Sequence, residues 1–195
     1  MATWVFEPGH TAAGFRARHM MVSWVRGHFK DVHGSLEFDP DNPVELAIEA
    51  TIQANKLWTG EPQRDGHLRS ADFLDAATHP AITFKSTSSK CVGASHYEVA
   101  GVLSIRGVSR PVVLDVHYLG RWSTPYWTEA GDAGPITRVG FVGETRINRH
   151  DFQVSWNGQL ENGGVVVGDE ISINLDVEAL LETDMKKAPA KGEPA

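Results

Sequence analysis

Apolar and polar residues alternate with a period of two along most of this chain. Such a period places successive side chains on opposite faces of a strand, so each run predicts a strand with one buried and one solvated face. The four clearest runs are VELAIEATIQ (44–53), PVVLDVHYLG (111–120), residues 138–147 and GDEISINLDVEAL (168–180). In the first run, for example, Leu46, Ile48 and Ile52 share one face while Glu45, Glu49 and Gln53 occupy the other.

The same pattern predicts four further strands, which brings the total to about eight. These are GHTAAGFRARH (9–19), HFKDVHGSLEFD (28–39), ITFKSTSS (82–89) and HYEVAGVLSIRG (96–107). The link RGVSRP (106–111) is short enough for a hairpin, and we interpret MMVSWVRG (20–27) as a short helical turn. Sequential, half-buried strands of this kind favour an all-β fold, either a closed antiparallel barrel or a sandwich.

One segment, RDGHLRSADFLDAATHP (64–80), breaks the alternation. Its apolar residues Leu68, Phe73 and Leu74 recur at helix-like spacing, and Ser70 is a suitable helix N-cap. Pro80 cannot continue a helix. We therefore predict a short helical insertion of one or two helices that covers a mouth or a wall of the barrel.

The inward faces carry small and medium side chains together with a few large ones. Gly101 and Gly143 lie in the middle of strands, where glycine often marks a bend or a close approach. This mixture fits an elongated apolar tunnel and fits equally well a tapered core filled by its own side chains. The alternation alone leaves both readings open.

Composition narrows the functional classes. A formal net charge of −7 argues against a broad nucleic-acid interface, and the lone cysteine, Cys91, excludes an intramolecular disulfide. No run approaches the ~20 apolar residues of a membrane-spanning helix, and the first residues do not read as a signal peptide. We expect a soluble, cytoplasmic protein with one domain over residues 1–182 and a disordered tail over 183–195.

Several motifs together resemble the YceI-like family of lipocalin-like barrels, which are described as polyisoprenoid-binding or lipid-binding. The matching stretches are His10–Asp39, Arg64–Thr87, Tyr97–Val116 and Gly140–Asn157, followed by GVVVGDEISINLDVE (164–178). The resemblance covers nearly everything before residue 180. It implies an eight-stranded antiparallel barrel around an apolar cavity, and it identifies residues 64–80 with the helical insertion of that family.

The resemblance also implies a ligand, a long-chain isoprenoid, an isoprenoid quinone or another lipid-like molecule. We expect it to contact the inward side chains Phe15, Leu46, Ile48, Ile52, Leu68, Phe73, Phe84, Leu103, Leu114, Val116, Phe141 and Ile173. Three polar residues are expected near the mouth: Arg64, His67 and Arg149. Arg64 suits head-group binding and the anchoring of loop carbonyls equally. For Arg149 we favour a structural role that ties a loop to a strand end.

No catalytic or metal-binding motif stands out. The nine histidines form neither HExxH nor an i, i+4 helical pair, and there is no GxSxG, GxGxxG or Walker lysine. We therefore predict a non-enzymatic binding, storage or transport protein without cofactor or metal, with transient membrane contact and a homodimer as weaker expectations. The alternatives are an enzyme that acts on the ligand's polar end through Arg64, His67, Asp72 and His150, or a stress-related barrel with a filled interior.

Overall fold

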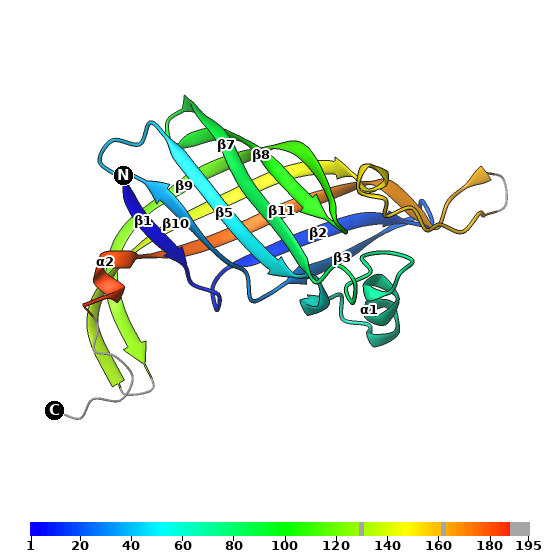
Figure 1. The fold of residues 1–195 in the computed structure, drawn as a ribbon, viewed down its shortest axis with the longest axis horizontal. Helices are drawn as coiled ribbons and strands as arrows, with labels where there is room; N and C mark the ends of the chain where they lie inside the picture. Colours follow the sequence, from blue (N-terminus) through cyan, green and yellow to red (C-terminus); the bar gives the residue numbers. More distant parts are fainter. Residues whose placement is uncertain (129–130, 161–162, 188–195) are drawn as a thin grey trace.

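Eight strands close into an antiparallel β-barrel in the computed structural model, which describes residues 1–128, 131–160 and 163–187. Around the ring the order is β1 (Ala2–Phe6), β4 (His33–Phe38), β5 (Leu46–Gln53), β7 (Ala81–Gly93), β8 (His96–Ile105), β9 (Val108–Thr128), β10 (Gly131–Asn148) and β11 (Val167–Leu181). The predicted all-β, eight-stranded barrel is therefore confirmed (Figure 1).

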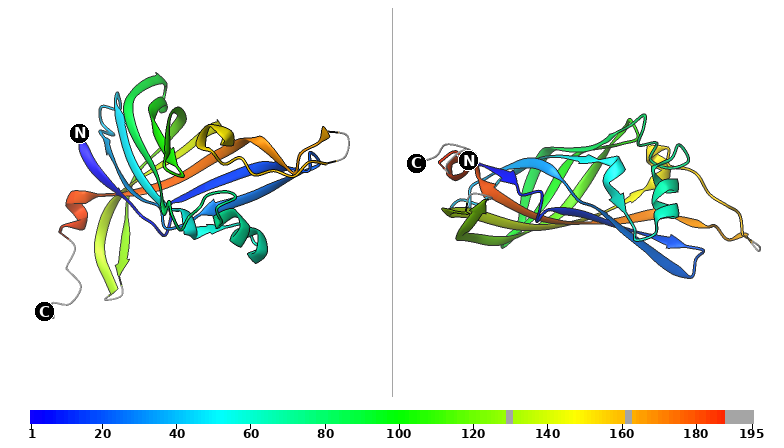
Figure 2. Two further views of the ribbon diagram at one scale, coloured as in Figure 1. Left: turned by 45° about the vertical axis from the view of Figure 1, so that its right-hand side comes forward. Right: turned by 90° about the horizontal axis from the view of Figure 1, so that it is seen from below.

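Strand β11 is long enough to serve two neighbours on the same edge. Its end pairs with β1, from Ala179 to Leu181, and this pairing closes the ring. Its first part pairs with β2 (Ala12–His19), which continues into β3 (Ser23–Phe29) and the two-residue strand β6 (Leu57–Trp58). These three strands therefore extend the wall of the barrel at one end (Figure 2).

Burial along the strands follows the alternation in the sequence. In β8, Tyr97, Val99, Leu103 and Ile105 are buried while the residues between them are exposed or half-buried. Gly101 also lies on the buried face. A larger residue would not fit there, because a Cβ at this position would lie 2.4 Å from Cζ of Phe84. The prediction that mid-strand glycine marks a close approach is confirmed at this position.

Two sequence interpretations in the N-terminal third are wrong. Residues 20–27 form a hairpin turn and most of β3, not a helical turn. The run 28–39 is not one strand, because β3 ends at Phe29 and β4 begins at His33, with Asp31 at a φ of 63° between them. His28 and His33 consequently belong to different strands.

The helical insertion exists, but its boundaries differ from the prediction. Helix α1 spans Pro62–Arg69, and the 3₁₀ helix η1 (Ala54–Lys56) precedes it. The N-cap of α1 is Glu61, whose carboxylate accepts hydrogen bonds from the backbone N–H groups of Gln63 and Arg64. Proline at the first position of α1 also suits a helix start. Ser70 is the C-cap rather than the N-cap. Phe73 and Leu74 follow the helix in turns rather than in a second helix.

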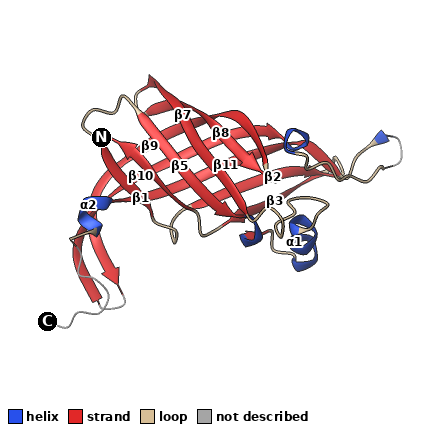
Figure 3. Ribbon diagram, viewed as in Figure 1, coloured by secondary structure: helices blue, strands red, loops and turns tan. Residues whose placement is uncertain are grey.

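The remaining helices lie at the two ends of the barrel (Figure 3). The 3₁₀ helix η2 (Arg149–Phe152) follows β10 at the end near α1, and α2 (Glu182–Met185) follows β11 at the opposite end. The predicted tail begins within α2, and its residues 188–195 lie outside the described part. None of the described helices is long and apolar enough to cross a membrane.

Candidate functional site: an apolar cavity with one polar rim

The barrel encloses a cavity of about 370 Å³, which lies within the usual range for small-molecule sites. All eight ring strands contribute side chains to the lining, β1 through Phe6 alone, and these side chains present little besides carbon. On β11 every second residue from Ile171 to Val177 lines the cavity, a span of about 20 Å at the usual rise per residue, and Val167 lines it nearer the start of the strand. The space is long rather than round, and its wall is almost entirely apolar.

An aromatic cluster closes one end of the barrel. Phe38 is fully buried, and its ring centroid lies 4.9 Å from that of Tyr118 and 5.2 Å from that of Phe141. Tyr97 completes the cluster at 6.1 Å from Phe38 and donates a hydrogen bond to the carbonyl of Pro43. Burial raises the pKa of both tyrosines above the ordinary value of 10.0, so the cluster stays neutral.

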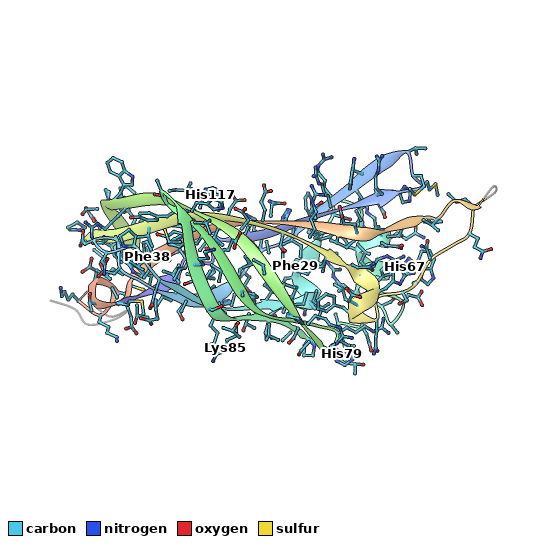
Figure 4. The ribbon with its side chains drawn as sticks, turned by 90° about the horizontal axis from the view of Figure 1, so that it is seen from above. Phe29, Phe38, His67, His79, Lys85 and His117 are labelled. Carbon is cyan, nitrogen blue, oxygen red and sulfur yellow. The ribbon has the colours of Figure 1, made fainter. Side chains whose placement is uncertain are left out.

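The other end carries the polar residues and is called the mouth below. It is formed by α1, the turns after it, η2 with the segment that follows, and the β2–β3 hairpin. Figure 4 shows His67 at this end and Phe38 toward the other. His67 packs edge-on against Phe73 and Trp156, at 5.0 and 4.7 Å between centroids, and its Nε2 lies 2.8 Å from Oδ2 of Asp72.

Arg64 lines the mouth, but its guanidinium donates hydrogen bonds to the protein itself. Its Nε donates to Oγ1 of Thr59 at 2.8 Å, and its Nη2 donates to the carbonyl of Thr59 at 3.0 Å. Asp65, which is buried, accepts from the backbone N–H and the hydroxyl of the same threonine. These contacts hold the start of α1 to the strand before it, which favours the anchoring role over head-group binding.

Arg149 has the structural role that the sequence favoured. The side chain is only 3 % exposed. It donates to the carbonyls of Val154, Trp156, Val167 and Gly168 at 2.7 to 3.2 Å. Burial lowers the pKa of its guanidinium, partly offset by Asp169. Arg149 thereby ties the segment after η2 to the start of β11, and both form the rim of the cavity.

Eleven of the twelve predicted apolar residues line the cavity, from Phe15 on β2 to Ile173 on β11. Leu46 is the exception. It is buried and faces inward as predicted, but its register partner is Phe38, so it packs at the closed end beyond the open space. Alternation gives the face of a side chain and not its depth along the barrel, which explains the error. Whether the lining residues contact a ligand stays a prediction.

Sequence reasoning missed one histidine cluster because it depends on strand register. His96 and His117 face each other across β8 and β9, stacked at 4.2 Å, and both contact Oδ1 of Asp115. The rings are only 15° from parallel, and each presents its Nε2 to that same carboxylate oxygen. The three side chains form a polar group held together by these contacts on the outer wall of the barrel.

The sequence analysis named His150 among the mouth residues of the enzyme alternative, but His150 lies outside η2 with partners that the sequence did not reveal. His150 contacts Asp169 at 2.8 Å through Nε2 and Ser155 at 3.2 Å through Nδ1. This order resembles a hydrolase triad, but none of the three residues lines the cavity, and His150 and Asp169 are solvent-exposed. The group braces the segment after η2 from outside, while Arg149 holds it from inside.

The model of the YceI-like domain matches residues 4–179. The chain belongs to the YceI-like family. Protein YceI of Escherichia coli O157:H7 is 36% identical over 148 residues, which cover 76% of this chain and 73% of the relative. The match therefore confirms the resemblance that the motifs carried.

Solved structures agree on the architecture. The YCEI protein of Campylobacter jejuni superposes with a TM-score of 0.66 at 28% identity, covering 85% of this chain and 90% of that one. A polyisoprenoid binding domain from Saccharophagus degradans superposes with a TM-score of 0.63 over 93% of this chain and 99% of its own. At 13% identity, the second likeness concerns the fold alone.

Proposed function

We propose that this YceI-like protein binds a long-chain isoprenoid or similar lipid inside the barrel, without chemical conversion, and so stores or carries it. The observation that supports this function is the long apolar cavity, closed by aromatic rings at one end and open toward a polar rim at the other. The fold neighbour that binds polyisoprenoids agrees with a ligand of this kind.

The energetics favour a hydrocarbon chain. Each methylene transferred from water to an apolar wall contributes roughly 0.8 kcal/mol, so a few five-carbon units provide on the order of 10 kcal/mol before the cost of ordering the chain. A charged ligand would find few partners inside, because Arg64 and Arg149 already donate to the protein. The lipid therefore enters with its hydrocarbon tail first, and its polar end lies at the rim beside His67.

The direct test is native mass spectrometry of the full chain purified without detergent, followed by organic extraction. We expect an added mass that extraction releases as an apolar lipid. If the protein carries no lipid and also fails to bind added polyprenol or ubiquinone, the proposal is refuted.

A matched pair of variants checks that the ligand occupies the cavity. Val112 lines the cavity, whereas its neighbour Val113 is exposed on the outer face of the same strand. Val112→Phe should reduce lipid loading about tenfold by filling the space, while Val113→Phe should leave loading unchanged. Equal loading in both variants would place the lipid elsewhere.

The enzyme hypothesis keeps one supporting observation, the contact between His67 and Asp72 beside the open cavity. It predicts that a lipid incubated with the protein changes mass and that His67→Gln abolishes the change. The binding function predicts that the lipid recovered after incubation has the mass of the lipid added. One mass spectrum of the lipid recovered after incubation therefore distinguishes the two functions.

A further inference from the structure

The β2–β3 hairpin protrudes at the mouth and carries an apolar tip. Met20, Met21 and Val22 connect the two strands, and all three are exposed, the methionines by about half and Val22 by 82%. Trp24 follows at the start of β3 and is also exposed. The hairpin extends past α1 at this end of the barrel (Figure 1). A patch of large apolar side chains at a protruding tip needs a partner.

The backbone of the tip adopts a strained conformation at Met20 and Met21. The N–H of Val22 donates to the carbonyl of His19, so Met20 and Met21 are the central residues of the turn. Both have positive φ, 47° and 61°, a combination that hairpins normally fill with Asn-Gly. Strained positions that persist often serve function, and here the strain places two flexible apolar side chains at the tip.

The charge around the tip is opposite to that of the whole protein. Residues 8–30 contain four of the basic residues and no aspartate or glutamate, although the chain as a whole carries a net charge of −7. Arg16 and Arg18 stack on the ring of Trp24, at 4.9 and 4.7 Å from its centroid. Arg26 pairs in register with Arg16 on the same face.

Acids on the neighbouring strand do not neutralise this face. Asp169 and Glu170 at the start of β11 are engaged by His150 and by Arg146 respectively. An apolar tip with a tryptophan and three arginines behind it matches the layers of an anionic bilayer, in which hydrocarbon lies below phosphate. The charge complementarity therefore selects a lipid surface rather than an apolar protein groove.

The inner face of the same hairpin lines the cavity. Ala17, His19 and Val25 belong to the cavity wall, and Arg18 also borders the cavity at this end. A bilayer that received the tip would therefore lie against the mouth, and a lipid could move between membrane and barrel with little exposure to water.

We propose that the β2–β3 hairpin docks on an anionic lipid bilayer, with Met20, Met21 and Val22 inserted among the head groups and the arginines on the phosphates. That docking serves the exchange of a lipid ligand rests on the proposed lipid-binding function, but the test of docking itself does not. Cofloatation with vesicles measures the hairpin, whereas lipid loading measures the cavity, so either can fail alone.

The experiment is cofloatation of the full chain with vesicles of phosphatidylcholine alone or in equimolar mixture with phosphatidylglycerol. We expect binding to the mixed vesicles only, and we expect it to weaken as salt rises, because salt screens the arginine–phosphate attraction. Binding that is equal on both vesicles, or absent from both, overturns the proposal.

The decisive variant is Met20→Asn with Met21→Gly, because it improves the turn while removing the apolar tip. We expect vesicle binding to fall about tenfold and the melting temperature to rise, so a loss of binding cannot be ascribed to misfolding. Arg26→Gln should reduce binding about fivefold, the effect of one basic residue near an anionic surface.

The β7–β8 hairpin provides matched controls. Lys90 and Val92 are exposed there, far from the mouth, and Lys90→Gln and Val92→Ser should bind vesicles like the wild type. Equal losses in controls and hairpin variants would refute docking by β2–β3. If the turn variant keeps vesicle binding but dissociates a dimer, the tip is a contact between copies of this chain, and docking is again refuted.

Discussion

Removing Arg149 is the sharpest test of how the mouth is held. The guanidinium binds four carbonyls from two segments, namely Val154 and Trp156 after η2 and Val167 and Gly168 at the start of β11. In Arg149→Met the apolar stem is retained, while every one of these hydrogen bonds is lost. The perturbation is therefore electrostatic rather than a change of volume.

The magnitude follows from two opposing effects. A hydrogen bond to a charged donor contributes about 1.5–3 kcal/mol, but the four carbonyls lie near a rim where water can replace part of the loss. Burial of the guanidinium has its own cost, as its lowered pKa indicates, and the methionine avoids that cost. We expect a net loss of about 3–5 kcal/mol in the free energy of unfolding, the usual result of breaking a buried charged network.

The assay is urea unfolding, together with a thermal melt. In a domain of this size each kcal/mol shifts the melting temperature by roughly 2–4 °C, so Arg149→Met should melt about 10 °C lower. Arg146→Met is the matched control, because Arg146 is exposed and has a surface ion pair with Glu170, and it should change stability by less than about 1 kcal/mol. An Arg149→Met protein as stable as this control would refute the anchoring role.

Three further predictions concern the barrel itself. Gly101→Ala should cost about 1–3 kcal/mol in urea unfolding, because the new Cβ meets the Phe84 ring; unchanged stability would contradict the contact. Phe38→Ala should cost about 3–5 kcal/mol and lengthen the cavity, detectable as a longer co-purified lipid. The raised pKa of Tyr97 and Tyr118 stabilises the fold fully below pH ~10, and this contribution is lost as pH rises further, since the unfolded tyrosines ionise first. A Tyr118→Phe protein should therefore show a flatter decline of its urea midpoint between about pH 9 and 11.

The wall of the cavity could be predicted from the sequence because one rule governs it. Alternation assigns each strand residue to one of two faces, and closure of the barrel turns one face inward. Phe15, Phe84 and Ile173 come from distant parts of the chain, yet the rule brings all three to the same space. The rule says nothing of depth, so Leu46 was assigned to the cavity although it lies with the aromatic closure.

Contacts that depend on register could not be predicted in the same way. His96 meets His117 because β8 and β9 pair with no shift between them, and a slip of one residue would have turned one ring to the opposite face. The partners of Arg149 are backbone carbonyls, which every residue possesses, so no residue type marks them in advance. The family resemblance pointed to the position of Arg149, while only the fold reveals what it holds.

The failure at residues 20–27 has a different cause, and it bears on function. The turn residues Met20, Met21 and Val22 include neither the glycine nor the asparagine that marks a hairpin turn, and the run MMVSWVRG therefore suggested a helical turn. The strands on both sides impose the hairpin, because Ala17 pairs with Val25 and His19 with Ser23 across it. Two methionines are thus held at positive φ against their local preference. Local rules are broken mainly where another requirement outweighs stability, so a turn that folds better and binds membranes worse would show that this requirement is lipid contact at the mouth.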